Sequence, residues 1–434
     1  MRTEFRLATL TVEEVERKKI SFEKAFTNAL AKIPWKGDIA FAFNLAWETL
    51  ENYMLADYML RKDGIPNPPL RRKSAFRVAF YLVFKKHRRV SEIKRFTGGL
   101  LSKRLYNILR QLEKVEKEED VIEEEDPAVR LSLKYSHPLW LVKRLLELLP
   151  KGSVEQLLKS NGRKISWLRV NALRMDERKA ERMLKKTGLR YLKDRDVPGL
   201  FRITDLKGPL SSIKAVSKGL LIPQDKGSLL VASSLEPKPF EVIVDACAAP
   251  GMKTAYIYEK TKGLCRIIAV DISLGRINEL VENLKRFLGS YENIDVVVSD
   301  SARIRITRNV DKVLVDAPCS NSGAIARDPA LRVTLRDYST IREYVRLQRR
   351  ILLGIVRNLK FSSLTYAVCS LLPEEGEETI MSALKEGLVE LERPNIPGRS
   401  GYTKYPDISA KVKRLFPHIH MTTGFFIANL VRKH

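Results

Sequence analysis

Residues 241–261 read EVIVDACAAPGMKTAYIYEKT, a short apolar run followed by a tight turn and a segment of helical length. The run has no polar alternation, which is typical of a strand that is buried on both faces. The turn contains Pro250 and Gly251 and opens into the longer segment, so we expect a strand, a turn and a helix. A buried strand that leads directly into a helix is the repeating unit of parallel α/β sheets.

The same alternation of strand and helix continues along the rest of the chain. Four further apolar runs follow: CRIIAVDIS (265–273), IDVVVSD (294–300), DKVLVDAPC (311–319) and SLTYAVCS (363–370). Two segments with a helical pattern lie between them: GRINELVENLKRF (275–287) and REYVRLQRRILLGIVRNL (342–359). This pattern predicts a doubly wound, mainly parallel sheet, a Rossmann-like fold of the α/β class. Ligands of such sheets bind at the carboxyl ends of the strands.

Acidic residues end several of these strands. The turn after the first strand opens a helix whose amides and dipole attract a negative group, and it lacks the three glycines of a dinucleotide fingerprint. Asp271 ends the second strand 20 residues after Gly251, a spacing at which a carboxylate commonly binds ribose hydroxyls. Asp300 follows the third strand, where it can accept from an adenine amino group. These features predict a ligand with a carboxylate, a sugar and adenine, such as S-adenosyl-methionine.

The charge of the chain indicates its partner. Lys and Arg number 78 against 52 Asp and Glu, which leaves a net charge of +26. Ion pairing consumes both signs equally and cannot leave such an excess, so a polyanionic partner is predicted. Nucleic acid is favoured over an anionic membrane, because no basic amphipathic anchor stands out. No run approaches the length of a membrane span and the N-terminus lacks the apolar core of a secretory signal, so we expect a cytoplasmic monomer with no membrane partner.

The four cysteines, at positions 247, 265, 319 and 369, contain no Cys-x-x-Cys pair. We therefore expect no zinc or other metal site and four free thiols. Cys319 and Cys369 each follow an apolar run and precede a turn, which places both at strand ends, facing a ligand. Cys247 is expected to contribute its backbone to the cofactor turn, and Cys265 to be a buried apolar residue.

A chain of 434 residues exceeds one compact core, and three domains are predicted. Residues 1–125 have helical patterns with dense Arg and Lys, which predicts a basic helical bundle. The acidic run from Glu113 to Asp126 predicts a domain boundary. Residues 130–239 mix helical and strand patterns and predict a small α+β (RRM-like) module. Residues 240–434 form the predicted catalytic domain.

Two further sets of predictions concern single residues outside the predicted catalytic domain. Ser21 and Asp38 are predicted to cap the N-termini of two helices of the bundle. Four basic residues are candidates for RNA contact: Lys143, Arg144, Arg169 and Arg174.

Several motifs, taken in order, resemble one family. They are DACAAPGMKT, VDIS, VVVSD, DAPCSNSGAIARDP, YAVCSLLPEEGEE and TTGFFIANLVRK. In this order and spacing they resemble the Sun (Fmu/RsmB-like) family of RNA cytosine-C5 methyltransferases, over roughly residues 130–434. The helical first section is similar to the NusB-like RNA-binding domain of one branch of that family. The chain departs from the family at CSNSG (319–323), where Ser-Gly followed by a small residue and Gly is usual.

The resemblance implies an S-adenosyl-methionine-dependent enzyme of class I that methylates carbon 5 of cytosine in RNA. Together with the strand ends it predicts a set of cofactor contacts: Cys247, Ala248, Ala249, Pro250, Gly251, Met252, Lys253, Asp271, Arg276, Asp300 and Asp316. The NusB-like section favours rRNA as the substrate, with tRNA as the alternative.

The implied chemistry accounts for both strand-end thiols. C5 of cytosine is too electron-poor to attack a methyl sulfonium, so a thiolate must first add at C6. By resemblance the nucleophile is Cys369, while Cys319 assists release of the product. Asp316 holds N3 and the exocyclic amine of the base, and Lys253 supports this cluster. The target nucleotide must be unpaired or extruded to reach these groups.

Two other functions remain open from the sequence. An enzyme that acts on DNA cytosine would use the thiol of its Pro-Cys step, Cys319, as the nucleophile, and the second thiol at Cys369 argues against this. A non-catalytic RNA-binding or ribosome-assembly factor could keep the fold, but loss of either thiol or of Asp316 would then be expected, and all three residues are present.

Overall fold

The computed structural model describes residues 1–115, 117–205 and 210–433. Glu116, residues 206–209 and His434 lie outside these ranges, so the predicted acidic run and the two later predicted domains are described in part. Contacts between residues divide the chain into two compact units. One combines Met1–Arg163 with Ile325–Tyr338, and the other combines Lys164–Ala324 with Ser339–His434. Each unit is described by itself.

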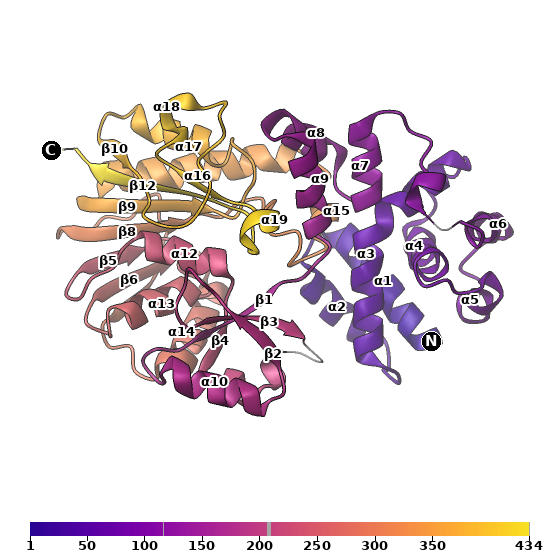
Figure 1. The fold of residues 1–434 in the computed structure, drawn as a ribbon, viewed down its shortest axis with the longest axis horizontal. Coiled ribbons are helices and arrows are strands. Elements are labelled where there is room, and N and C mark those ends of the chain that lie inside the picture. The colour runs from indigo at the N-terminus through magenta and orange to yellow at the C-terminus, as the bar shows by residue number, and fades with distance from the viewer. Residues whose placement is uncertain (116, 206–209, 434) are drawn as a thin grey trace. The chain divides into compact units, whose positions relative to one another are not determined.

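The first unit is helical, as its apolar periodicity predicts (Figure 1). Its elements are α1 (Arg2–Lys18), α2 (Phe22–Leu30), α3 (Ile39–Lys62), α4 (Leu70–Phe84), α5 (Val90–Phe96), α6 (Lys103–Leu112), η1 (Glu118–Asp120), α7 (Pro127–Tyr135), α8 (Leu139–Leu148), α9 (Lys151–Ser160) and α15 (Leu331–Thr334). The Asp38 carboxylate accepts from the Phe41 N–H at 2.9 Å, which confirms the predicted cap of α3. Ser21 occupies the N-cap position of α2 as predicted, but its side chain makes no capping hydrogen bond, and Asp328 accepts from the Phe22 N–H instead.

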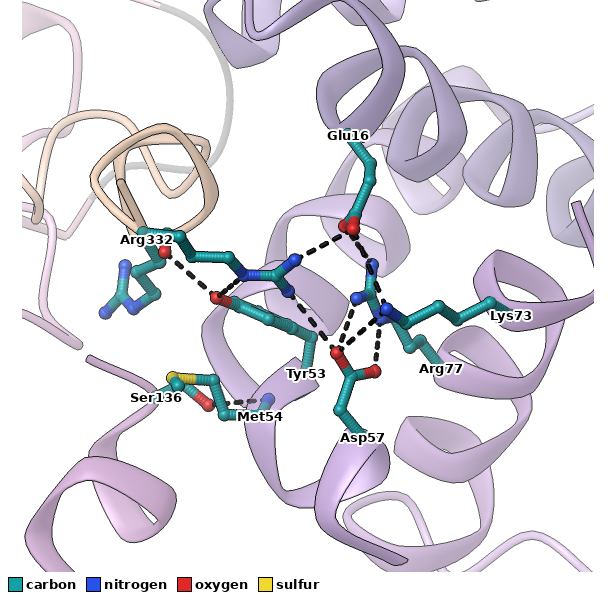
Figure 2. A network of polar contacts seen from close by, with 9 residues as sticks. Glu16, Tyr53, Met54, Asp57, Lys73, Arg77, Ser136 and Arg332 are labelled. Carbon is teal, nitrogen blue, oxygen red and sulfur yellow. Dashed lines mark hydrogen bonds and ion pairs between the residues drawn. The ribbon is translucent and has the colours of Figure 1, made fainter. Parts of the chain in front are cut away.

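A late segment of the chain completes this unit. Ala330 and Val333 are buried in the same apolar core as the N-terminal helices. The Tyr53 hydroxyl of α3 donates to the Arg332 carbonyl at 2.9 Å (Figure 2). The Arg332 guanidinium is itself fully buried and donates to the Asn161 carbonyl at the end of α9, at 2.9 Å. The segment Ile325–Tyr338 is therefore part of the helical core rather than a surface loop.

A buried ion network lies beside this segment (Figure 2). Arg77 is fully buried and makes two hydrogen bonds to Asp57, at 2.7 and 2.6 Å, and one to Glu16 at 2.7 Å. Arg336 adds a second guanidinium, 2.8 Å from Glu16 and 3.3 Å from Asp57. Burial alone would raise the pKa of Glu16, but Arg77 and Arg336 outweigh it and lower this pKa to about 2.

The second unit contains a small antiparallel sheet in the order β2-β3-β1-β4. Its elements are β1 (Ser166–Val170), α10 (Glu177–Lys186), β2 (Arg190–Lys193), β3 (Leu200–Asp205), η2 (Leu210–Ser212), α11 (Lys214–Ser217) and β4 (Leu221–Pro223). The compact units part at Arg163 and Lys164, so α7–α9 lie in the helical unit although residues 130–239 were predicted as one module. The division into three domains stays a prediction.

One basic residue of the small sheet is not on the surface. Arg169 of β1 is 2% exposed, donates to Gln224 at 2.6 Å and forms an ion pair with Glu259. Its predicted role in RNA contact is therefore wrong, because a guanidinium enclosed by its own partners cannot reach a phosphate. Arg174 is exposed, and it donates to the Lys218 and Arg286 carbonyls at 2.8 and 3.1 Å.

The large sheet has the strand order β10-β12-β9-β8-β5-β6-β7, and β11 pairs with β12. Its elements are α12 (Lys226–Ser234), β5 (Val242–Asp245), α13 (Met252–Lys260), β6 (Arg266–Asp271), α14 (Leu274–Leu288), β7 (Ile294–Val298), β8 (Val310–Asp316), α16 (Ser339–Asn358), β9 (Phe361–Val368), α17 (Glu377–Leu384), β10 (Val389–Glu392), α18 (Pro406–Ser409), β11 (Lys413–Leu415), α19 (Pro417–His420) and β12 (Phe425–Arg432). Strands β9, β8, β5, β6 and β7 are parallel, whereas β12 runs antiparallel to β9. The predicted doubly wound, mainly parallel α/β sheet is confirmed (Figure 1).

Helices cover both faces of this sheet. Side chains alternate along the strands, so that Ile243 and Leu314 pack with α12, α13 and α14, while Val244 and Val313 pack with α16 and α17. The strand order changes direction between β5 and β8, which is the point where ligands of such sheets bind. In the described ranges, no helix has the length and apolar character needed to cross a membrane.

Candidate active site

The turn after β5 presents the start of a helix. Gly251 occupies the N-cap position of α13 with a φ of 91°, a conformation that favours glycine, and no side chain caps the helix. A Cβ at Gly251 would also lie 3.1 Å from the Leu280 side chain. The first N–H groups of α13 are thus left for an anionic group, such as the carboxylate of S-adenosyl-methionine.

Asp271 ends β6 and braces this turn. Its carboxylate accepts from the Ala249 N–H at 3.3 Å and from the Ser273 N–H at 3.1 Å, and it lies 3.3 Å from Arg276. Arg276 also donates to the Ala249 carbonyl. Asp271 Oδ1 accepts only one of these bonds, so part of its capacity as an acceptor is not used by them.

Apolar side chains are exposed beside the strand-end acids. Ile272, directly after Asp271, is 65% exposed, and Val298 at the end of β7 is 50% exposed. Asp300 follows β7 and accepts from the Ala302 N–H at 3.0 Å. An adenine ring needs an apolar contact and a hydrogen-bond acceptor, and this edge of the sheet supplies both.

The end of β8 carries an ion pair. The Lys253 ammonium, from the first turn of α13, lies 2.5 Å from the Asp316 carboxylate. Burial alone would lower the pKa of Lys253, but the charge of Asp316 and their hydrogen bond raise it, with a smaller contribution from Cys369. Asp245, at the end of β5, is fully buried, and burial raises its pKa to about 6. The strand ends thus gather one ammonium group and several carboxyl groups.

The two predicted thiols meet beside this ion pair. The sulfur atoms of Cys319, after β8, and Cys369, after β9, are 3.2 Å apart. Cys319 is 5% exposed, whereas Cys369 is half-buried. The hydrogen bond to Cys369, followed by burial, raises the pKa of Cys319 well above its usual value. Of the other two cysteines, Cys265 is buried as predicted.

Glu375 explains how the two cysteine loops are held together. This buried carboxylate accepts from the Ser320 N–H at 2.8 Å, from the Ser320 and Ser370 hydroxyls at 2.5 Å, and from Gln348 at 2.9 Å. It therefore ties the residue after Cys319 to the residue after Cys369. Sequence reasoning did not single out Glu375, because nothing local distinguishes it from the other acids of the run LLPEEGEE.

The structure thus brings Lys253 and Asp316 into contact, and Cys319 and Cys369 into contact, at one edge of the sheet. Asn321 was not singled out as a site residue, yet its side chain lies beside both thiols. The signal for it in the sequence was the departure CSNSG.

Two family models match separate parts of the chain. The family model for 16S rRNA methyltransferase RsmB/F matches residues 232–431. A second model, for the ferredoxin-like domain of RsmF/B-like methyltransferases, matches residues 137–205. The chain is 33% identical over 305 residues to ribosomal RNA small subunit methyltransferase B of Cronobacter sakazakii, covering 69% of this chain and 67% of the relative.

Two other relatives differ in substrate. The chain is 32% identical over 314 residues to a mouse 28S rRNA (cytosine-C(5))-methyltransferase, and this match spans 39% of the length of that relative. It is 34% identical over 227 residues to a tRNA (cytosine(72)-C(5))-methyltransferase of Pyrococcus horikoshii, covering 51% of this chain and 54% of the relative.

Solved structures support the fold. The crystal structure of PH0851 has a TM-score of 0.78 at 24% identity and covers 98% of both chains, which is a likeness of fold. NSun6 from Pyrococcus horikoshii, solved with SFG, an analogue of S-adenosyl-methionine, has a TM-score of 0.60 at 25% identity over 67% of this chain and 97% of that chain.

The sheet is doubly wound, and its carboxyl edge has the N-terminus of α13 and acidic residues beside exposed apolar side chains. Together with the similar proteins, these features define a methyltransferase that uses S-adenosyl-methionine. The chain belongs to the RsmB/F methyltransferase family.

Proposed function

We propose that the protein methylates carbon 5 of a cytosine in RNA and that rRNA is its substrate. The observation that carries the proposal is the 3.2 Å approach of Cys319 and Cys369 beside the Lys253–Asp316 pair. Methyl transfer to a nucleophilic atom would need neither thiol, whereas C5 of cytosine must first be activated by addition at C6. The relatives that carry rRNA and tRNA cytosine-C5 methyltransferase names support the same chemistry.

In this mechanism the Cys369 sulfur forms a bond to C6, and the electron pair of the C5–C6 double bond moves to C5. S-adenosyl-methionine, when bound at the start of α13, supplies the methyl group that C5 takes up. Asp316 accepts a hydrogen bond from the exocyclic amine of the base, and Lys253 fixes the Asp316 carboxylate. Cys319 then assists loss of the C5 proton, after which the C6–sulfur bond breaks and Cys369 is regenerated.

Several residues are proposed to hold the cofactor. The backbone from Cys247 to Lys253 would face its carboxylate, Asp271 its ribose hydroxyls and Asp300 its adenine amino group. Arg276 would act through Asp271, since its guanidinium lies 3.3 Å from that carboxylate.

Transfer of a labelled methyl group from S-adenosyl-methionine to RNA tests the proposal. Purified wild-type protein is incubated in parallel with unmodified rRNA and unmodified tRNA, and bisulfite sequencing then locates any 5-methylcytosine. Cys369→Ala serves as the matched inactive control. Methylation of tRNA alone would exclude the rRNA assignment, and a label on any atom other than cytosine C5 would overturn the proposed chemistry.

A further inference from the structure

The side chain of Asn321 lies against both thiols. The Cys369 thiol donates to Asn321 Oδ1 at 2.7 Å, and the Cys319 sulfur is 3.9 Å from the same oxygen. The other end of the amide is also engaged, because Asn321 Nδ2 donates to the Cys319 carbonyl at 3.3 Å. That bond fixes which end of the amide faces the sulfur atoms. A carbonyl oxygen accepts but cannot donate, so the S–H of Cys369 is directed at Asn321.

The backbone at Asn321 explains why this residue can occupy the position. Its φ is 58°, in the left-handed region that favours glycine and that asparagine tolerates better than most side chains. The family usually has glycine at this point of the motif, as the departure CSNSG indicated. Asparagine therefore adds an amide beside the thiols at little cost to the backbone.

The backbone of the loop two residues further on is closely packed. A Cβ at Gly323 would lie 2.2 Å from the Gly424 carbonyl oxygen, and the Gly323 N–H donates to the Cys369 carbonyl at 3.1 Å. Asn321 itself is exposed, whereas Cys319 is buried. Asn321 thus stands on the open side of the thiol pair, the side from which a base must arrive.

We propose that Asn321 is a positioning residue that holds the Cys369 sulfur in line for attack on C6. The inference rests on the proposed function, since it refers to the adduct at C6. When the sulfur forms its bond to C6, the S–H proton leaves to solvent and the C5–C6 electron pair moves to C5. Asn321 releases its hydrogen bond and takes no proton.

Asn321→Gly tests this role because glycine keeps the left-handed backbone and removes the amide. At saturating RNA, we expect the rate of formation of the covalent protein–RNA adduct to fall between about twofold and tenfold, the range for removal of one hydrogen bond, with KM for RNA unchanged. Asn321→Asp retains an acceptor for the S–H but places a negative charge beside the sulfur, which opposes its deprotonation. Adduct formation by this variant should shift to higher pH.

A second measurement uses the free protein without RNA or cofactor. Iodoacetamide attacks thiolates, and peptide mass mapping reports the modification of Cys369 separately from that of Cys247. Only a protonated thiol can donate to Asn321, so this hydrogen bond opposes formation of the thiolate. Asn321→Gly should therefore raise the alkylation rate of Cys369. The same variant should lower the rate of adduct formation, because the sulfur is no longer positioned. Asn309→Gly, at an exposed loop position, is the matched control and should change neither rate.

The outcomes separate the two proposals. Unchanged alkylation and unchanged adduct formation in Asn321→Gly would overturn the positioning role. A fall in both rates with a lower melting temperature would also overturn it, because loss of fold would then explain the effect. If wild-type protein forms no adduct with any RNA, the proposed function fails, and the alkylation rate alone then decides the role of Asn321.

Discussion

The sulfur atoms of Cys319 and Cys369 lie 3.2 Å apart, although the two residues are 50 positions apart in the chain. Their environments differ. The hydrogen bond to Cys369, followed by burial, holds the pKa of Cys319 well above its usual value. Cys319 is 5% exposed, whereas Cys369 is half-buried, so Cys369 is the sulfur that a base can reach more easily. This difference supports Cys369 as the proposed nucleophile and leaves Cys319 a role after methyl transfer.

Single replacements of the two thiols should give opposite results. Cys369→Ala cannot form the bond to C6 and should carry no RNA through a denaturing gel. Cys319→Ala should complete methyl transfer and then stall, because release is impaired. Its expected signature is a stable covalent protein–RNA complex that requires S-adenosyl-methionine.

The double variant is the control and should form no complex. If Cys319 were only a packed loop residue, its replacement would lower the rate modestly and leave no adduct. An adduct that survives Cys369→Ala and disappears in Cys319→Ala would show that the roles are reversed, as in an enzyme of the DNA type.

Asp271→Ala should weaken binding of S-adenosyl-methionine. A hydrogen bond to a charged group contributes about 1.5–3 kcal/mol, so the affinity should fall by roughly tenfold to a hundredfold. Calorimetry on the variant measures this loss, and thermal unfolding checks that the turn at Ala249 has survived. Asp295→Ala removes an exposed carboxylate that pairs with Arg266, and it should bind the cofactor like wild type. Equal affinity in both variants would remove Asp271 from the ribose role.

Arg336→Gln should make the protein less resistant to acid. The pKa of Glu16 in the folded protein is about 2, below its ordinary value of 4.5, so Glu16 stabilises the fold above pH 4.5 and loses this contribution as pH falls toward 2. Without Arg336 this pKa rises, and unfolding followed by circular dichroism should move to higher pH.

The control for this acid series is Arg104→Gln, because Arg104 pairs with Asp63 on the surface at 2.9 Å and exposed pairs contribute little. Acid unfolding at the same pH in wild type and Arg336→Gln would show that Arg77 and Lys73 lower the pKa of Glu16 without help from Arg336.

Affinity for RNA should depend on salt through the helical unit. Lys86, Arg88 and Arg89 line a hollow of about 520 Å³ together with Phe41, Glu48 and Glu92, so basic side chains outnumber acidic ones beside an aromatic ring, which suits single-stranded RNA. In Lys86→Ala with Arg89→Ala, the slope of log affinity against log salt should decrease by roughly 0.7 for each phosphate that the protein no longer neutralises. Lys185→Ala with Lys186→Ala removes the same charge from α10, and an equal decrease there would mean that only net charge matters.

Local sequence patterns were sufficient for the large sheet. Apolar runs and the helical segments between them predicted a mainly parallel sheet. Asp271 and Asp316 stand at the ends of two of these runs, so their positions at strand ends were predicted as well. Cys319 and Cys369 were also predicted to lie at strand ends, but their contact was not, because it depends on β8 and β9 being parallel neighbours.

Other features depend on partners far along the chain and could not be predicted. Arg169 lies in a short strand, and nothing local indicated that Glu259, 90 positions later, would enclose it. The same holds for Arg332, whose buried guanidinium binds a carbonyl at Asn161. The relation of Asn321 to the thiols needed the loop conformation, which a departure of one residue from a motif does not reveal.

The segment Ile325–Tyr338 has a consequence for synthesis on the ribosome. Residues Met1–Arg163 emerge first, yet their core lacks Ala330 and Val333, and Glu16 lacks Arg336, until strands β5 to β8 have been translated. At roughly 5–20 residues per second, the delay is roughly 9–35 s. During that interval the nascent helices have an unfilled apolar surface and incomplete charge neutralisation. The helical unit therefore completes its fold only after Tyr338 has been synthesised, although Met1–Arg163 is synthesised before the second unit.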